Sequence, residues 1–318
     1  MTPTSVLDQK AEGFRHEALF YGGSGAFVER ITPFLQAGVD AGEPILVVLD
    51  TGKIELLRSA LNGRADHIRF EDMAEVGSNP ARIIPVWQAF VDEHAALGRP
   101  FRAVGEPIWP ARSADELAEC EQHESLLNVA FGDPPAWRLL CPYDVVSLPP
   151  AVLAEARRNH PFVDEGDGPL SSSTFRGLAG ASKPFEGSAL PEPPGSFVEM
   201  SFDSKELRAV RTFVAGHAAR LGLGPARIEE LVLAVNEVAS NSVLHASGEG
   251  DVRMWRSDGV VVSEIRDTGR ITDPLVGRRR PQLGQDGGFG LWLANQFCDL
   301  VQIRSAETGS VVRLHVKV

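Results

Sequence analysis

The stretch Ile228–Ala246, IEELVLAVNEVASNSVLHA, decides the fold of the second half of the chain. Its apolar residues recur at intervals of three and four, which is the period of an α-helix. Pro225 precedes the stretch at a position typical of a first helical turn, and Gly248 lies just past its end. We therefore predict one amphipathic helix with an apolar stripe that faces a core.

A second face of this predicted helix is polar. Glu237, Asn241 and His245 follow one another at four-residue spacing, so they lie on one side of the helix. An amide oxygen can ligate Mg²⁺, and a carboxylate can accept a proton. Taken alone, these residues favour a solvated polar face on a core helix, and His245 fits a structural role.

Length and composition predict a soluble globular protein of about two domains. The chain has 318 residues, of which 43% are hydrophobic and 23% are charged. The sequence contains no apolar run long enough for a transmembrane helix, and residues 1–17 contain no apolar signal core. Three scattered cysteines do not form a disulfide framework, so we expect a reducing, cytoplasmic setting and no membrane partner.

The net negative charge of the chain is confined to its first part. Residues 1–196 carry 16 basic and 28 acidic side chains, whereas residues 197–318 carry 15 of each. This balance argues against direct binding of nucleic acid, because phosphate contacts require basic surface.

Short apolar runs alternate with helical patterns over residues 17–144. This order predicts an α/β domain with a mainly parallel sheet. The expected strands are Ala18–Tyr21, Ile45–Asp50, His67–Phe70, Phe101–Val104 and Trp137–Pro142. The expected helices cover residues 25–41, 53–62, 80–97, 113–131 and 151–159.

The carboxyl ends of these strands are where an open α/β sheet binds ligands. The first end carries Gly22-Gly23-Ser24-Gly25, which resembles a phosphate loop but lacks the lysine that grips phosphates, so we predict a tight turn there. A small-ligand pocket is expected at the same edge. Its candidate residues are His16, Tyr21, Glu106, Trp109, His123, Cys141 and Tyr143, together with Glu124.

Cysteine and histidine residues in this region leave two interpretations open. Cys120 and His123 lie three apart on a predicted helix, and with Cys141 they could form a metal or redox site. No CxxC motif supports such a site, so buried thiols and a surface histidine are the favoured interpretation.

The order of several short motifs in residues 12–162 resembles the MEDS family of bacterial sensory domains. They are His16-Glu17-Ala18-Leu19-Phe20-Tyr21, Gly42-Glu43-Pro44, Gly105-Glu106-Pro107-Ile108-Trp109, Glu124-Ser125-Leu126-Leu127-Asn128 and Cys141-Pro142-Tyr143-Asp144. The resemblance implies a degenerate ATPase-like α/β fold that lacks the phosphate loop and senses an unknown small molecule. We assign residues 1–164 to this domain.

Residues 165–196 are rich in glycine, proline and serine and show no core period, so we predict a flexible linker. Residues 197–318 then predict a different, α+β domain. Its expected elements are a strand at Phe197–Phe202, a helix to about Leu221, the helix described above, and hairpins turning at Asp258-Gly259 and Thr308-Gly309 with a helix at Gly290–Cys298 between them. Two helices, two hairpins and this third helix make a sandwich with one mixed sheet.

Three separated motifs of this second domain suit a nucleotide. The helix supplies Glu237 and Asn241, a strand ends in Asp267-Thr268-Gly269, and Gly287-Gly288-Phe289-Gly290-Leu291 opens a helix. An aspartate can accept a hydrogen bond from an exocyclic amine, and a glycine-rich helix start can meet phosphate. Arg278–Arg280 lie between the last two motifs, where one arginine could meet a γ-phosphate.

The order of these motifs resembles the GHKL (Bergerat-type) ATPase superfamily, within it the serine kinases that act as anti-sigma factors. The resemblance implies ATP and Mg²⁺ as cofactors, Glu237 as the catalytic base and Asn241 as the Mg²⁺ ligand. It places Asp267 and Gly269 at adenine and Gly288, Gly290, Leu291 and Arg279 at the phosphates. Gly269 and Gly288 lie only 19 positions apart, which implies a short lid. Ile271 departs from the family's Asp-x-Gly-x-Gly loop, which puts the loop shape in doubt.

The resemblance implies a homodimeric anti-sigma protein that binds Mg-ATP. Such a protein phosphorylates a serine of an anti-anti-sigma (STAS-type) partner, sequesters a sigma factor, or does both, under control of the sensory domain. A two-component histidine kinase is one alternative, but residues 165–196 cannot form the dimerising helical hairpin that it needs, and no acidic residue follows His217. A non-catalytic, nucleotide-dependent binding module is the other.

Overall fold

A computed structural model describes residues 13–131, 136–181, 185–186, 189–281 and 288–318. The chain forms two compact units. The first consists of residues up to Val76 and of Val86–Ala181, and the second of Gly77–Pro85 and Ser182–Val318. Within the described residues, no helix combines the length and the apolar composition that crossing a membrane requires.

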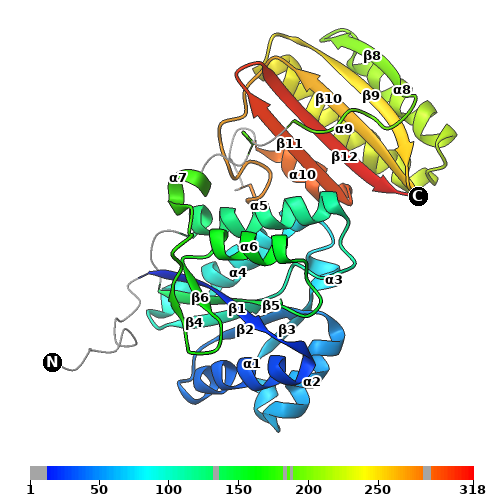
Figure 1. The fold of residues 1–318 in the computed structure, drawn as a ribbon. Helices are drawn as coiled ribbons and strands as arrows, with labels where there is room; N and C mark the ends of the chain where they lie inside the picture. Colours follow the sequence, from blue (N-terminus) through cyan, green and yellow to red (C-terminus); the bar gives the residue numbers. More distant parts are fainter. Residues whose placement is uncertain (1–12, 132–135, 182–184, 187–188, 282–287) are drawn as a thin grey trace. The chain divides into compact units, whose positions relative to one another are not determined.

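The first unit contains a seven-stranded sheet of order β3-β2-β4-β5-β1-β6-β7 (Figure 1). Its strands are β1 (Phe14–Tyr21), β2 (Ile45–Leu49), β3 (Arg69–Asp72), β4 (Phe101–Gly105), β5 (Trp137–Asp144), β6 (Phe162–Asp164) and β7 (Leu170–Ser171). All pairs are parallel except β6 with β7, which confirms the predicted α/β class with a parallel sheet.

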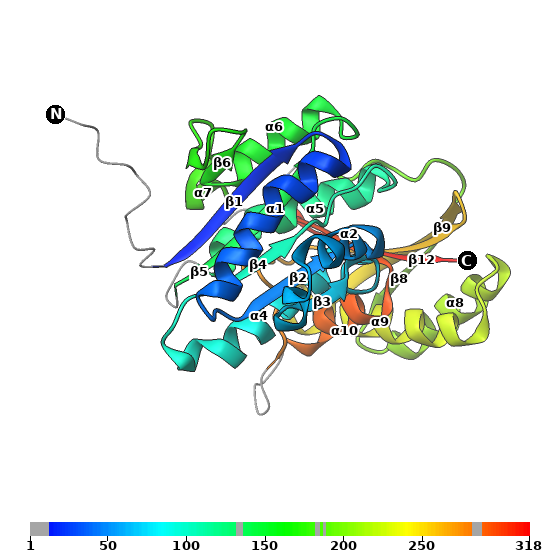
Figure 2. The same ribbon diagram turned by 90° about the horizontal axis from the view of Figure 1, so that it is seen from below.

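Helices cover both faces of this sheet, and β2 and β4 are buried along their whole length, as expected for central parallel strands. Helices α1 (Gly23–Asp40) and α2 (Thr51–Leu61) lie on one face, as Figures 1 and 2 show. Helices α4 (Ile83–His94), α5 (Ala114–Ala130) and α6 (Pro150–Asn159) lie toward the other. The short elements are α3 (Met73–Val76), α7 (Gly177–Ala181) and the 3₁₀ turns Arg64–His67, Pro80–Arg82 and Ala95–Leu97.

The segment that we predicted as a linker contributes to both units. Residues up to Ala181, with β7 and α7, belong to the first unit, and residues from Ser182 belong to the second. In the second unit, Arg313 Nη2 donates to the Pro191 carbonyl at 2.5 Å, and Arg266 Nη2 donates to Glu192 at 3.1 Å. Pro191 and Glu192 of this segment therefore lie against the sheet of the second unit.

The second unit contains a five-stranded sheet of order β11-β12-β10-β9-β8. The strands are β8 (Val198–Asp203), β9 (Glu249–Ser257), β10 (Val260–Asp267), β11 (Leu300–Ala306) and β12 (Gly309–Lys317). The α+β class is confirmed, but the expectation of a mixed sheet is wrong, because all four strand pairs are antiparallel. Hairpins and their neighbours account for every pairing, so no parallel crossover arises.

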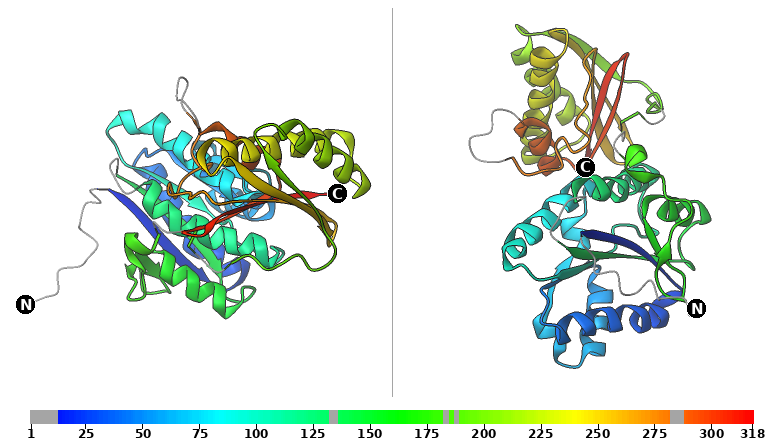
Figure 3. Two further views of the ribbon diagram at one scale, coloured as in Figure 1. Left: turned by 90° about the horizontal axis from the view of Figure 1, so that it is seen from above. Right: turned by 90° about the vertical axis from the view of Figure 1, so that its left-hand side faces the viewer.

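Three helices lie together on one face of this sheet, as the right-hand view of Figure 3 shows. They are α8 (Leu207–Arg220), α9 (Pro225–His245) and α10 (Phe289–Phe297). Helix α9 packs against both of the others and begins with a proline after the extended Gly224, as its sequence predicts. Its apolar stripe, which includes the fully buried Leu231 and Ala239, faces the core, so its polar face is left for a site.

The segment Gly77–Pro85 belongs to the second unit through the end of α10. Asn79 Nδ2 donates to the carbonyls of Asn295 and Cys298 at 3.1 and 3.2 Å. Arg82 donates to the carbonyls of Asn295 and Gln296, each at 2.7 Å. These donors satisfy carbonyls that a helix terminus leaves without partners.

Candidate functional site: a pocket between α9, β10 and α10

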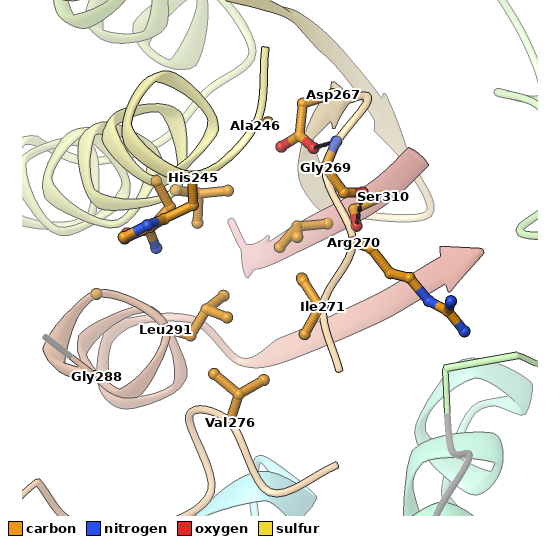
Figure 4. A pocket seen from close by; sticks show the side chains of 14 residues that line it. His245, Ala246, Asp267, Gly269, Arg270, Ile271, Val276, Gly288, Leu291 and Ser310 are labelled. Atoms are coloured by element: carbon orange, nitrogen blue, oxygen red, sulfur yellow. Dashed lines mark hydrogen bonds between the residues drawn. The ribbon is translucent and has the colours of Figure 1, made fainter. Parts of the chain in front are cut away.

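A pocket opens on the polar face of α9, beside the end of β10 and the start of α10 (Figure 4). Its lining residues come from all three of the predicted motifs. They are Val238, Asn241, His245, Ala246, Asp267, Gly269, Arg270, Ile271, Val276, Gly288, Gly290, Leu291, Ser310 and Val312.

The first turn of α10 lies directly against the polar face of α9. A Cβ atom placed on Gly290 would lie 3.0 Å from Asn241 Nδ2 and 3.3 Å from Glu237 Oε2. Only a glycine allows this close approach of the helix start to both side chains. Gly288 caps α10 in the left-handed region, with φ of 86°. The carboxylate, the amide and the backbone at a helix start thus meet at one end of the pocket.

Asp267 is held in place at the other end. Its Oδ2 accepts a hydrogen bond from the Ser242 hydroxyl at 2.6 Å, and its Oδ1 accepts one from the Gly269 backbone N–H at 2.8 Å. A carboxylate can accept about four hydrogen bonds, so acceptor capacity is left for a ligand amine. A glycine is needed at position 269 for close packing on α9, because a Cβ there would lie 2.8 Å from the Ala246 Cβ.

Two serines fix the loop in which Ile271 replaces the family's second glycine. The Ile271 backbone N–H donates to Ser305 Oγ at 2.8 Å, and Ser310 Oγ donates to the Gly269 carbonyl at 2.8 Å. The two hydroxyls also lie 2.8 Å apart. Ile271 itself lines the pocket, so the loop keeps a defined shape with an apolar side chain at this position.

The described part of the segment between Gly269 and Gly288, for which we predict a lid, is anchored on α10. Asn295 Nδ2 donates to the carbonyls of Gly277 and Leu291 at 3.0 and 3.1 Å. Gly277 has φ of 71°, and a Cβ there would lie 2.9 Å from the same amide. The three lid arginines differ, since Arg278 is buried while Arg279 and Arg280 are exposed. Gly287 lies outside the described residues.

The glycine-rich turn of the first unit has a different environment. The Gly23 backbone N–H, at the start of α1, donates to Asp144 Oδ1 at 3.2 Å. Burial opposes ionisation of Asp144, but hydrogen bonds from Val146, Ser147 and Gly23 lower its pKa below the ordinary value. A protein carboxylate therefore takes the place that a phosphate would need, which agrees with the predicted tight turn.

Two family models match the chain, one after the other along the sequence. Residues 15–161 match the model described as the methanogen/methylotroph DcmR sensory domain, MEDS. Residues 200–316 match the model described as a histidine kinase-like ATPase domain. The chain joins a MEDS domain to a histidine kinase-like ATPase domain.

Similarity to individual proteins is weaker. A search of curated proteins finds no match to the chain. Among solved structures, the chain is similar to the RsbU and RsbW domains of a protein from Mycobacterium tuberculosis, at 20% identity and a TM-score of 0.30. That match covers 39% of this chain and 33% of the other, so the chain spans about a third of that structure's length.

The candidate pocket residues of the MEDS domain lie on two faces of its sheet. Tyr21 and His16 are an odd number of positions apart on β1, so their side chains point to opposite faces. On one face, the Tyr21 hydroxyl donates to Glu106 Oε1 at 2.7 Å, and Lys53 Nζ donates to Glu106 Oε2 at 2.5 Å. Burial raises the pKa of Glu106 to about 7, although Lys53 opposes the shift.

On the other face, His16 and Cys141 come together, with His16 Nε2 3.4 Å from Cys141 Sγ. The combination of Cys120 and His123 with Cys141 does not form in the described residues, because the buried Cys120 donates instead to the Pro107 carbonyl at 3.4 Å. The sequence suggested a surface position for His123, and this expectation is wrong, because the side chain is buried. Tyr143 is also buried, and Trp109 stacks on the Arg112 guanidinium at 3.7 Å.

Several pocket residues of the ATPase domain were not predicted as ligand contacts. Ser242, Arg270 and Ser310 surround Asp267 and Gly269, and the exposed His245 lines the pocket rather than the core. Ser242 directly follows Asn241 on α9, so the sequence alone could have placed it near the site. Ser310 is brought in only by the pairing of β10 with β12, whereas Arg270 directly follows Gly269 in the sequence.

Proposed function

We propose that the ATPase domain binds Mg-ATP and transfers its γ-phosphoryl group to a serine of a protein partner, as an anti-sigma serine kinase does. The partner is an anti-anti-sigma (STAS-type) protein, and a sigma factor is the protein that the same domain sequesters. The observation that carries the proposal is the contact of Gly290 with both Glu237 and Asn241, opposite an oriented Asp267. This arrangement supplies one end of the pocket for the adenine ring and the other end for the phosphates.

The residues of the pocket fit a magnesium nucleotide. The Asn241 amide oxygen would ligate Mg²⁺, which neutralises phosphate charge. Asp267 would accept the adenine amine, and the apolar Ile271 and Val276 would contact the ring. The missing Cβ atoms of Gly269 and Gly290 let the backbone pack closely against Ala246 and Asn241 at the edge of the pocket.

Glu237 has the role of base in this proposal. Its carboxylate would accept the proton of the serine hydroxyl as the new oxygen–phosphorus bond forms, while the bond to the β-phosphate oxygen breaks and ADP leaves. Glu237 is partly buried on α9, beside the start of α10, where an incoming hydroxyl can approach. General-base catalysis of this kind contributes about 10²- to 10⁴-fold to rate.

A serine of a separate protein is favoured over a histidine of this chain. His217 lies within α8, a helix of the sandwich itself, with its ring centroid 4.4 Å from that of Phe213. A phospho-acceptor histidine needs a helical hairpin that brings it to the nucleotide, and α8 is instead packed on α9. The MEDS domain would control the reaction by binding a small molecule, but its seven candidate residues cannot form one pocket, because they lie on opposite faces of the sheet.

The proposal is tested by transfer of radiolabelled γ-phosphate from ATP to purified STAS-type and sigma-factor candidates from the same genome. We expect labelling of a serine in one STAS-type protein, loss of labelling with Glu237→Ala, and full labelling with Glu229→Ala, an exposed glutamate on the same helix. Binding of ATP by Glu237→Ala is measured in parallel. Absence of transfer to every candidate, with ATP bound normally, would contradict the kinase role and favour a binding module.

A further inference from the structure

Four metal-ligating side chains converge in the core of the MEDS domain, and the pocket at α9 belongs to the other unit. They are His16, Glu124, Cys141 and His160, whose ligand atoms all lie within 4.8 Å of one another. None is more than 2% exposed. They come from four segments, namely β1, α5, β5 and the residue that ends α6. We propose that these four side chains bind one divalent transition-metal ion of the zinc class.

The distances between the donor atoms suit a tetrahedral ion. Glu124 Oε2 lies 3.1 Å from His16 Nε2 and 3.2 Å from His160 Nε2. Cys141 Sγ lies 3.4 Å from His16 Nε2. Zinc bonds of about 2.0–2.3 Å place neighbouring tetrahedral ligand atoms about 3.3–3.7 Å apart, so small movements would centre an ion among them.

Hydrogen bonds outside the cluster fix which nitrogen of each histidine carries a proton. His160 Nδ1 lies 2.7 Å from the Ala156 carbonyl oxygen, which can only accept, so Nδ1 is the protonated atom. His16 Nδ1 lies 3.2 Å from Asn128 Oδ1. Asn128 Nδ2 donates to the Asn159 carbonyl at 2.8 Å, which orients this amide and makes Oδ1 the acceptor. Both Nε2 atoms therefore direct lone pairs at the centre of the cluster.

Three electron-rich atoms then face one another in a buried space, because Glu124 Oε2 is also an acceptor. Protons on both Nε2 atoms would create two adjacent imidazolium ions, whose ring centroids are 4.0 Å apart, against a single carboxylate. Burial of such an excess charge is costly. One metal cation satisfies all three atoms and the Cys141 sulfur at once, and outer-sphere Nδ1–H donors are what metal-bound histidines normally have.

The donor set indicates the kind of metal. Two imidazoles, one carboxylate and one thiolate match borderline-soft ions such as Zn²⁺ and Co²⁺, and they match Mg²⁺ and Ca²⁺ poorly. Four protein ligands complete a tetrahedron, as in structural zinc sites, so the ion would join two central strands to the helices that cover them. The inference does not depend on nucleotide binding, because no residue of the second unit takes part.

The experiment uses full-length protein produced in cobalt-supplemented minimal medium, since a buried site is filled most readily as the chain folds. We expect about one Co²⁺ per chain, tetrahedral d–d absorption bands and a thiolate-to-cobalt charge-transfer band. Cys141→Ser should lose the charge-transfer band, whereas Cys120→Ser, the matched change at a second buried thiol on this domain, should keep it. Protein made with zinc should contain about one Zn²⁺ per chain by mass spectrometry of the metal.

Two results would overturn the inference. Wild-type protein that folds without cobalt or zinc would show a purely hydrogen-bonded cluster, and a charge-transfer band that survives in Cys141→Ser would place the metal elsewhere. If Cys141→Ser fails to fold, Glu124→Gln decides. It keeps the shape of the side chain but removes the charge, and it should lower the metal content, while an unchanged content would count against the site.

Discussion

The two glycine-rich helix starts of this protein resemble each other in sequence and differ in what faces them. At α1, Gly23 donates to the Asp144 carboxylate, so the helix terminus already has an anionic partner. At α10, Gly290 faces the Glu237 carboxylate and the Asn241 amide across a pocket that also contains Asp267. A glycine-rich turn therefore indicates a ligand site only when the side chains opposite it leave the helix start free.

The same contrast extends to the ends of the strands. In the MEDS domain, Glu106 is buried and its two oxygens accept hydrogen bonds from Tyr21 and Lys53. In the ATPase domain, Asp267 is only partly buried and lies at the edge of an open pocket. In the first domain, Tyr21 and Lys53 thus occupy both oxygens of Glu106, whereas Asp267 of the second domain lines a pocket that a ligand can enter.

The largest expected effect tests the burial of Glu106 in the first domain. Because the pKa of Glu106 is about 7 when folded and ordinarily 4.5, the folded state binds its proton more tightly. The group has no cost below pH 4.5, lowers stability progressively as pH rises to about 7, and costs about 3 kcal/mol above that. Glu106→Gln should remove this pH dependence.

The measurement is hydrogen exchange of β4 and β1 peptides in wild type and Glu106→Gln across this pH range, corrected for intrinsic exchange. Glu75→Gln, at an exposed glutamate of the same domain, is the control and should follow wild type. Identical pH profiles for Glu106→Gln and wild type would contradict the buried, proton-binding state of Glu106.

The next effect tests whether the open site uses a metal-bound nucleotide. Asn241→Ala removes the proposed Mg²⁺ ligand and should weaken Mg-ATP binding about 30-fold, within the range for changes around metal sites. Affinity for ATP in the presence of a chelator should change little. Asn236→Ala, at an asparagine of the same helix that contacts Arg211, provides the control for calorimetric titrations. Equal losses with and without Mg²⁺ would exclude a role of Asn241 in metal binding.

The smallest effect compares the two helix starts directly. Gly290→Ala places a methyl group 3.0 Å from Asn241 Nδ2, so ATP affinity should fall about tenfold, and steric strain of about 1–2 kcal/mol is the reason. Gly25→Ala, in the first turn of α1, meets nothing within 4 Å and should leave ATP affinity unchanged. It should also stabilise α1 slightly, by about 0.5–1 kcal/mol. Equal responses of the two variants in an ATP-binding titration would remove the contrast between the sites.

Much of the ATPase site was predictable from the sequence because its three motifs are local. The helical period around Glu237, the strand end at Asp267 and the glycines before Leu291 each appear within a few residues. Ser310 was not predictable in this way, since the β10–β12 pairing brings it beside Asp267. The mixed sheet was a wrong expectation, because hairpin signals fix neighbouring pairs but not the order of the whole sheet.

The proposed metal cluster in the MEDS domain was even less predictable from the sequence than Ser310. His160 follows α6 and approaches His16 because the next strand, β6, pairs in parallel with β1. No sequence spacing relates it to Cys141 or Glu124. The sequence left Cys120 and His123 open as partners of Cys141, because they share a helical face, but it favoured buried thiols. In the structure, Cys120 donates to a backbone carbonyl instead.

Titration of the full-length protein with Mg-ATP by calorimetry tests the central claim most directly, with Asp267→Asn and Asp144→Asn as the two variants. The account predicts one ATP site per chain in wild type. Binding should be at least tenfold weaker in Asp267→Asn, because the asparagine amide replaces the oriented carboxylate acceptor, and it should be unchanged in Asp144→Asn. Binding that survives in Asp267→Asn and is lost in Asp144→Asn would place the nucleotide at α1 and contradict the account.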